Sequence, residues 1–220
     1  MIKTEFVTFS REPFFEIARE LIQPGDKVLD IGAGEGDFAD YCQKKDIYLY
    51  DGNPESVALL KEKHKNTFYG KLPLLPFEKD FFDLIHLSHV IEHLQPEDAY
   101  KTLEEMGRCC KPGGKIVIST PLFWDGFYDD LSHIKPYNPL VIEKYLGGAK
   151  KKNLTRTEIT DQFKLLRLEY RYRENFPEWD LYKSSQLIKY LLKLITFLRR
   201  KFYKKYSRTG YTIVLEKQNT

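Results

Sequence analysis

Cysteine is scarce in this chain. Three cysteines, Cys42, Cys109 and Cys110, occur among 220 residues. An odd, sparse set does not build a disulfide framework, and two adjacent cysteines do not have the spacing of zinc ligands. We therefore expect a protein of a reducing compartment, the cytoplasm.

Long apolar runs are also missing. No stretch reaches the ~18 uninterrupted apolar residues that a membrane span needs, and the opening MIKTEFVTFSREPFF lacks the apolar core of a signal peptide. Hydrophobic residues make up 42% of the chain and charged residues 30%. This balance predicts one soluble globular domain over 1–220.

One segment contains no acidic residue. Residues 183–208 hold nine Lys or Arg and no Asp or Glu, so the remainder has a net charge of 3 − 9 = −6. Apolar residues recur at helical spacing over 184–205, which predicts a basic amphipathic helix. Such a helix could bind reversibly to an anionic membrane surface. Alternatively, it could form a dimer contact or a lid. Nucleic acid is the third alternative and fits less well.

Residues 27–37 read KVLDIGAGEGD. Val28, Leu29 and Ile31 predict a short buried strand, and three alternating glycines allow a tight turn into a helix over 36–44. Strand, glycine turn and helix open the nucleotide-binding α/β folds, with the ligand at the helix N-terminus. The glycines taken alone also suit a simple turn.

Residues 30–36 resemble the first motif of the class I S-adenosylmethionine (SAM)-dependent methyltransferases. Three further segments resemble the same family in the same order: 70–77 with its Leu-Pro-Phe ending, FFDLIHLSHVIEHL at 81–94, and KPGG at 111–114. The resemblance implies an α/β, Rossmann-like sandwich with a seven-stranded, mostly parallel sheet and an antiparallel last strand. It also implies SAM as the cofactor and S-adenosylhomocysteine as its product.

The expected elements follow this plan. We expect strands over 28–31, 47–50, 67–69, 81–87, 116–119, 163–173 and 211–216, and helices over 12–22, 36–44, 55–64, 96–110, 139–146 and 184–205. Residues 1–25 form a helical cap, 26–121 the SAM-binding core, and 122–160 the acceptor-pocket region. The basic insert, 174–209, separates two strands that the family joins by a hairpin.

Cofactor contacts are expected at the carboxyl ends of the first four strands. Asp51 ends the second strand, where one carboxylate can accept from both ribose hydroxyls; alternatively, 51–54 is only a turn. Arg11 is a candidate for a ligand carboxylate. The expected cofactor-binding residues are Asp30, Gly32, Ala33, Gly34, Gly36, Asp51, Gly52, Lys71, Leu72, Ser88 and His89.

Lys71 departs from the family pattern. In many methyltransferases of this class the corresponding loop begins Gly-Asp, and the Asp accepts from the adenine amino group. Here Lys71 follows Gly70 and has no acceptor to offer. We expect backbone groups near Lys71 and Leu72, with apolar packing, to hold the adenine.

Three histidines follow the glycine motif. His86 lies on an expected strand, and no H-E-x-x-H pattern accompanies His86, His89 and His93, so we expect no metal ion. His93 lies beyond the carboxyl end of a strand, where open α/β sheets bind ligands. It is either a general base or a hydrogen-bonding residue that orients its loop.

The stretch after the fifth strand is aromatic and polar, and class I enzymes often build the acceptor pocket there. Its S-H-I-K-P-Y run at 132–137 is similar to methyltransferases of polysaccharide and glycolipid assembly. His133 either lies near the acceptor as a base or fixes the loop. The neighbouring aromatic residues either stack on a sugar ring or belong to the core: Phe123, Trp124, Phe127 and Tyr128.

The sequence thus predicts a SAM-dependent methyltransferase with His93 and His133 as catalytic candidates. The expected acceptor is a hydroxyl of a saccharide or lipid-linked glycan, and the enzyme, a monomer or homodimer, would work near the inner face of a membrane. A methyltransferase acting on another small molecule or on RNA is the alternative. A non-catalytic SAM-binding interaction module is a further one, which Lys71 keeps open.

Overall fold

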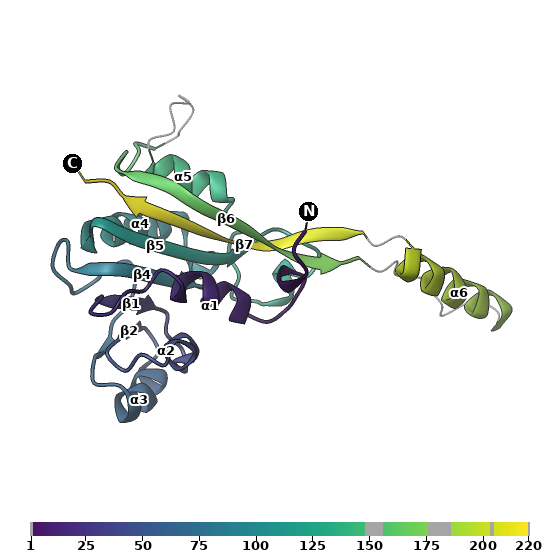
Figure 1. Cartoon of the computed structure of the whole chain (residues 1–220), viewed down its shortest axis with the longest axis horizontal. Coiled ribbons are helices and arrows are strands. Elements are labelled where there is room, and N and C mark those ends of the chain that lie inside the picture. The colour runs from purple at the N-terminus through teal and green to yellow at the C-terminus, as the bar shows by residue number, and fades with distance from the viewer. Residues whose placement is uncertain (1, 148–155, 176–185, 203–204, 220) are drawn as a thin grey trace.

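The computed structural model describes residues 2–147, 156–175, 186–202 and 205–219. One sheet contains β1 Val28–Ile31, β2 Tyr48–Asp51, β3 Thr67–Tyr69, β4 Phe82–Ser88, β5 Cys110–Pro121, β6 Phe163–Glu174 and β7 Tyr206–Lys217. Its order is β3-β2-β1-β4-β5-β7-β6 (Figure 1). The first five strands pair in parallel, and β7 runs antiparallel between β5 and β6. The predicted fold class is confirmed.

The helices begin at recognisable signals. They are α1 Glu12–Arg19, α2 Asp37–Cys42, α3 Pro54–Lys63, α4 Pro96–Cys109, α5 Pro139–Leu146 and α6 Gln186–Phe202. Asn53 and Asn138 cap α3 and α5 by accepting from backbone N–H groups two residues on, and proline occupies the first helical position in both. Short 3-10 turns cover Thr4–Phe6, Ile91–His93 and Phe127–Asp129.

The sheet buries both faces. On β5, Ile116 and Ile118 pack into one core with α4 and α5, while Val117 between them packs into the other core with α1, α2 and α3. This alternation is the period of two that a pleated strand imposes. Because both faces are covered, the edge formed by the carboxyl ends of the parallel strands is where the loops that can bind a ligand lie.

Some boundaries differ from the sequence prediction. β7 begins at Tyr206 rather than 211, because it pairs with β6 through Glu174, so the segment between the two strands is 175–205. β5 begins at Cys110 rather than 116, with a register shift opposite β4. The helix predicted over 36–44 is shorter, because Gln43 has a left-handed backbone (φ 51°) that ends it.

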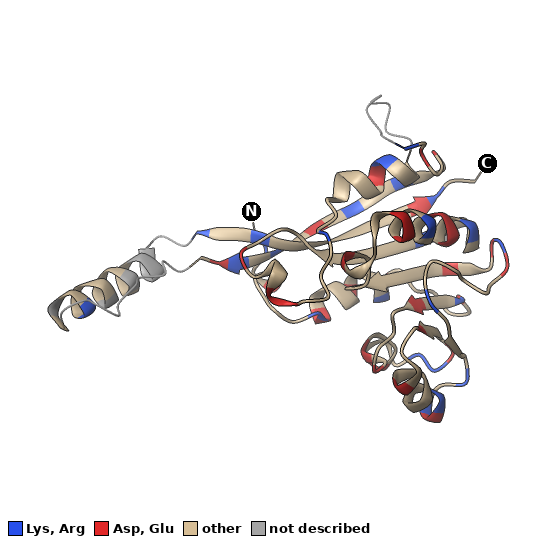
Figure 2. Cartoon of the chain, turned by 180° about the vertical axis from the view of Figure 1, so that it is seen from behind, with Lys and Arg blue, Asp and Glu red and all other residues tan. Residues whose placement is uncertain are grey.

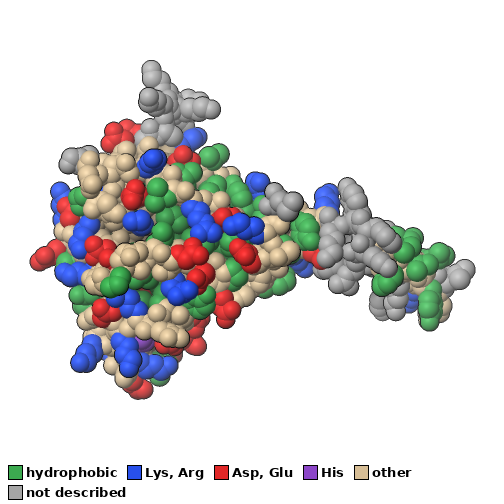
Figure 3. Space-filling view, in the orientation of Figure 1, with side chains coloured by type: hydrophobic (Ala, Val, Ile, Leu, Met, Phe, Trp, Pro, Cys, Tyr) green, Lys and Arg blue, Asp and Glu red, His purple; other side chains and the backbone are tan. Residues whose placement is uncertain are grey.

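Helix α6 confirms the predicted basic helix within 184–205 and projects away from the sheet, beyond the β6–β7 hairpin (Figure 1). Figure 3 shows hydrophobic side chains on its surface, well apart from the main body. On the body itself, acidic and basic residues are interspersed over the helices that flank the sheet (Figure 2). Within the described ranges, no helix combines the length and the apolar character that crossing a bilayer would require.

Candidate active site

The glycine turn joins β1 to α2 in left-handed backbone conformations. Gly32 has φ 71°, and a Cβ placed there would lie 2.2 Å from Cγ2 of Val90, so no side chain fits. Gly34 has φ 57°, and nothing lies within 4 Å of the position that a Cβ would take. The turn therefore packs tightly against the loop after β4 and leaves open space on its other side.

Asp51, at the end of β2, is fixed by the turn. Its Oδ2 accepts from the backbone N–H of Gly34 at 2.8 Å, and its Oδ1 accepts from that of Asn53 at 2.7 Å. Each carboxylate oxygen keeps a further lone pair. The carboxylate is thus held in place with acceptor capacity left over, as a ribose diol requires.

Asp30 and His86 form a buried pair. They lie opposite each other on the parallel strands β1 and β4, and His86 Nδ1 is 2.7 Å from Asp30 Oδ1. The imidazole stacks on Phe38 with ring centroids 3.9 Å apart. The sequence analysis missed this pairing, because the strand register that produces it is not written in either motif.

A cavity of about 230 Å³ lies beside the glycine turn. Its lining includes these residues: Arg11, Phe15, Asp30, Gly32, Ala33, Gly34, Glu35, Asp37, Phe38, His86 and Ser88. The guanidinium-bearing residue, Arg11, comes from the start of α1. Asp51 is hydrogen-bonded to Gly34 of this lining, and Arg11 lies in the lining itself. This carboxylate and this arginine suit a ligand with a ribose and an α-carboxylate, so the residues present fit SAM.

The remaining predicted cofactor residues have other surroundings. Gly36 precedes α2 as its N-cap residue, and a Cβ there would come within 2.9 Å of Leu60, so Gly36 allows α2 to pack closely on α3. Gly52 lies against Gly70 and the side chain of Lys71, at the tips of β2 and β3, and Leu72 packs on the core. His89 has φ 56° and donates its backbone N–H to Ser119.

Glu92 is the main residue that the sequence analysis missed. It is fully buried, and its Oε2 accepts from Thr120 Oγ1 at 3.0 Å. Burial acts to raise the pKa of Glu92, but the adjacent His89 and the bond from Thr120 bring it below its ordinary value. The pKa of His89 is lowered by burial. The sequence did offer one signal for Glu92, because this residue stands between His89 and His93 just beyond the end of β4.

His93 and His133 lie together although they are far apart in the chain. Their ring centroids are 4.8 Å apart. The backbone N–H groups of Ile134 and Lys135 both donate to the carbonyl of Glu92, which ties the stretch after β5 to the turn after β4. The structure thus brings both catalytic candidates to one place, and their role stays a prediction.

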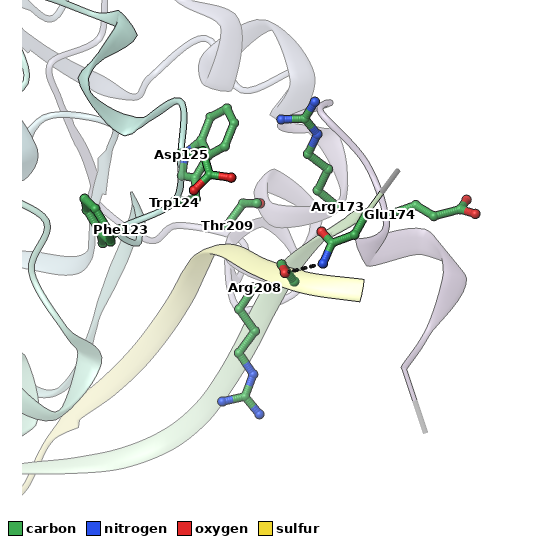
Figure 4. A pocket seen from close by; sticks show the side chains of 9 residues that line it. Phe123, Trp124, Asp125, Arg173, Glu174, Arg208 and Thr209 are labelled. Atoms are coloured by element: carbon green, nitrogen blue, oxygen red, sulfur yellow. Dashed lines mark hydrogen bonds between the residues drawn. The ribbon is translucent and has the colours of Figure 1, made fainter. Parts of the chain in front are cut away.

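A larger cavity of about 640 Å³ lies beyond β5 (Figure 4). It is lined by Phe123, Trp124, Asp125, Arg173, Glu174, Asn175, Ser207, Arg208 and Thr209. The Arg173 guanidinium lies 5.3 Å from the Trp124 ring centroid, and Asn175 donates to Ser207 at 2.7 Å. Among the four aromatic candidates, Phe127 is core, whereas Phe123 and Tyr128 are exposed.

Arg171 of β6 is a second missed residue. Its guanidinium lies over the Phe14 ring at 4.7 Å, and its Nε is buried without a hydrogen-bond partner. Burial, reinforced by the charge of Arg11, lowers the pKa of Arg171 to about 10. A buried donor without a hydrogen-bond partner is costly unless a ligand meets it.

The strand order, the glycine turn and the Asp51 site define a class I SAM-dependent methyltransferase fold, with SAM as its cofactor. A family model described as a methyltransferase domain matches residues 9–191. The chain belongs to this methyltransferase family.

Known relatives and structures agree with this class. The ubiquinone/menaquinone biosynthesis C-methyltransferase UbiE of Cupriavidus metallidurans is 30% identical over 115 residues, covering 47% of this chain and 46% of that protein. That of Francisella tularensis subsp. holarctica is 30% identical over 142 residues, covering 59% and 51%. The chain thus spans about half the length of the curated relatives it matches.

Solved structures share the fold at low identity. A SAM-dependent methyltransferase from Archaeoglobus fulgidus has a TM-score of 0.60 and 24% identity, with 94% of this chain and 95% of that one covered. A putative sarcosine dimethylglycine methyltransferase from Galdieria sulphuraria has a TM-score of 0.63 and 16% identity, with 100% and 91% covered.

Proposed function

We propose that the protein transfers the methyl group of SAM to a hydroxyl of a small acceptor, a saccharide or a lipid-linked glycan. The observation that carries this proposal is the convergence of His93 and His133 at 4.8 Å between ring centroids. They lie beyond β4 and β5, at the same edge of the sheet as the glycine turn. A hydroxyl acceptor needs a base, and both imidazoles are placed to serve.

SAM supplies a methyl group already activated on a sulfonium. The chain's own residues therefore mainly align the cofactor with the acceptor and exclude water from them. Asp51 orients the ribose, and Arg11 neutralises the α-carboxylate. His93 or His133 accepts the acceptor's proton as the new bond forms. Phe127 packs on His133 with ring centroids 4.7 Å apart, which limits the orientations of the imidazole.

The larger cavity supports a polar, hydroxyl-rich acceptor. Trp124 and Phe123 offer ring faces, while Asp125, Arg173 and Arg208 offer charged hydrogen-bonding groups. Ring contacts connect this wall to the histidines, from Phe123 to Tyr128, from Tyr128 to Phe127, and on to His133. Stacking faces with peripheral polar groups suit a sugar ring.

A carbon acceptor is the second candidate. The observation that favours it is the name of the curated relatives, which are C-methyltransferases of ubiquinone/menaquinone biosynthesis. An acceptor screen therefore includes quinone precursors beside nucleotide sugars and glycolipids. The readout is formation of S-adenosylhomocysteine together with a mass gain of one methylene on the acceptor.

Titration calorimetry with SAM tests the cofactor site first. We expect micromolar binding that weakens at least about tenfold in Asp51→Ala, since hydrogen bonds to a charged group contribute about 1.5–3 kcal/mol. The control is Asp46→Ala, which removes an exposed carboxylate that pairs with Lys44 just before β2. Equal affinity in Asp51→Ala would remove the ribose role.

The double variant His93→Ala, His133→Ala tests the base. We expect it to keep SAM affinity and to lose roughly 10²–10⁴-fold in turnover. Full turnover with a true acceptor would eliminate both histidines as bases. SAM binding without methylation of any acceptor would instead favour the interaction module.

We further propose that α6 rests on an anionic membrane, close to lipid-linked acceptors. Leu191, Leu194, Ile195, Phe197 and Leu198 are exposed, and residues 183–208 carry nine basic residues and no acidic one. Apolar insertion and attraction of about 1 kcal/mol per basic residue act together at such a surface. The excess of basic residues favours an anionic lipid surface over an uncharged partner.

Vesicle sedimentation tests this contact with phosphatidylglycerol and with phosphatidylcholine vesicles. We expect binding to the anionic vesicles alone, lost in Leu191→Glu, Leu194→Glu. The matched control is Leu59→Glu, Leu140→Glu, at exposed leucines of α3 and α5. Equal sedimentation of both double variants would contradict the proposal, and a concentration-dependent dimer would assign α6 to self-association.

A further inference from the structure

The cluster of Glu92, His93 and His133 has the composition of a metal site. One ligand atom from each residue lies within 4.8 Å of the other two. Glu92 is fully buried, and both histidines are half-buried. Two imidazoles and one carboxylate are a donor set that first-row transition metals accept.

The hydrogen bonds of His93 fix which ring nitrogen is available. Its Nδ1 lies 3.1 Å from the Ser132 carbonyl oxygen and 3.0 Å from Ser132 Oγ. The single hydroxyl hydrogen of Ser132 is donated to Asp130 Oδ1 at 2.6 Å. His93 Nδ1 therefore faces only acceptors and must carry the hydrogen, which leaves a lone pair on Nε2.

His133 has the same arrangement. Its Nδ1 is 2.6 Å from the carbonyl oxygen of Phe127, so it donates there and Nε2 carries the lone pair. Metal-binding histidines characteristically donate their other ring N–H to a carbonyl or carboxylate, which fixes tautomer and orientation. Both imidazoles of this cluster are already oriented in that way.

Glu92 supplies an independent observation. Its Oε2 is occupied by Thr120, but Oε1 is buried without a hydrogen bond. His89 Nδ1 lies 3.2 Å from Oε1, a contact that helps to lower the pKa of Glu92. A fully buried carboxylate oxygen left without a hydrogen bond is costly, and a cation would satisfy it.

We propose that Glu92 Oε1, His93 Nε2 and His133 Nε2 bind one divalent first-row transition cation, such as Mn²⁺, Co²⁺ or Zn²⁺. Ligand atoms about 2.1 Å from one ion stand about 3–3.5 Å apart, so the three ligand atoms, which lie within 4.8 Å of one another, move closer together on binding. Magnesium fits poorly because it prefers oxygen ligands. The absence of an H-E-x-x-H pattern led us to expect no metal ion; the ligands proposed here come from two separate loops instead.

Three protein ligands leave positions for water or for an acceptor oxygen. This consequence rests on the proposed function, whereas the site itself does not. A cation there would bind the hydroxyl to be methylated and lower its pKa, so that the proton leaves to water; the imidazoles would then act as ligands in place of bases. Cation binding is therefore measured without SAM or acceptor, so that the two proposals fail independently.

The experiment titrates the chelator-treated, dialysed full chain with Mn²⁺, Co²⁺, Zn²⁺ and Mg²⁺ by calorimetry. Binding of Co²⁺ is also followed by its visible absorption. We expect one site per chain, with affinity at least about tenfold lower in each of Glu92→Gln, His93→Gln and His133→Gln. The matched control is His64→Gln, a buried histidine 3.9 Å from Asp40 outside the cluster.

Circular dichroism confirms that each variant is folded before its affinity is compared. If Glu92→Gln does not fold, His93→Gln and His133→Gln still decide the test, because both of these histidines are only half-buried. No transition-metal binding, or equal binding in the three variants and in wild type, would overturn the proposal. Magnesium binding as tight as that of Mn²⁺ would also overturn the assigned donor set.

Discussion

Asp30 and His86 face each other across β1 and β4, with 2.7 Å between Oδ1 and Nδ1, and both side chains are almost completely buried. This contact fixes two strands at the edge where the cofactor cavity lies. It also predicts how the protein responds when one partner is removed.

His86→Leu removes the donor and leaves a buried carboxyl group without its partner. We expect a loss of about 1–3 kcal/mol in the free energy of unfolding, measured by urea denaturation. His64→Leu is the matched control, because both ring nitrogens of this buried histidine lack hydrogen-bond partners. It should be near neutral, and equal losses would show that volume rather than hydrogen bonding decides.

Gly32→Ala places a methyl group 2.2 Å from Val90 Cγ2 in a left-handed backbone. We expect this substitution to destabilise the protein by more than the roughly 1–2 kcal/mol that the backbone alone costs an L-residue. Gly34→Ala, which has open space at that point, should show only the backbone cost. Thermal unfolding checks both.

Val90→Ala should then rescue part of the Gly32→Ala loss and none of the Gly34→Ala loss. The double variants give the coupling energy directly. A Gly32→Ala protein as stable as Gly34→Ala would contradict the close contact.

Asp83 predicts an acid dependence of stability. Burial raises the pKa of Asp83, but the bonds from Lys111 at 2.7 Å and the Lys27 backbone at 2.9 Å outweigh it, so the pKa is lowered. The unfolded state then takes up the proton more readily, and the stabilisation is present above pH 3.8, the ordinary value. It is lost as the pH falls through the lower value of the folded state.

Asp83→Asn should therefore cost about 1 kcal/mol at pH 7 and less at pH 3, which lies below the ordinary pKa of 3.8. Urea midpoints at the two pH values measure this difference. Glu62→Gln, at an exposed position of α3, is the control. An equal loss of unfolding free energy at both pH values would mean that Asp83 stabilises the protein through packing and not through its charge.

The three cysteines are free, as their number predicted. Burial raises the pKa of Cys42 and of Cys110 to about 12, and that of Cys109 to about 11. We expect the native protein to resist iodoacetamide at pH 8, because thiolates are the reactive form. Mass spectrometry should find three labels only after denaturation; rapid native labelling would contradict this burial.

The sequence predicted a seven-stranded, mostly parallel sheet and most element positions. The motifs at 30–36 and 81–94 run past the carboxyl ends of β1 and β4, and that at 111–114 lies in the first part of β5. The sequence did not predict the contacts of Glu92, Arg171 or the Asp30–His86 pair. These depend on strand register and on packing between segments far apart in the chain. Periodicity reports which face a residue occupies, but not which residue lies opposite.

Strand β6 pairs with β7, which follows it in the chain and lies between it and β5. On the ribosome, β1 to β5 can therefore assemble while β6 still waits for a partner. The nascent chain holds β6 and the basic helix outside the sheet until β7 is synthesised. Addition of β7 closes the largest loop and is expected to be a late, slow step of folding.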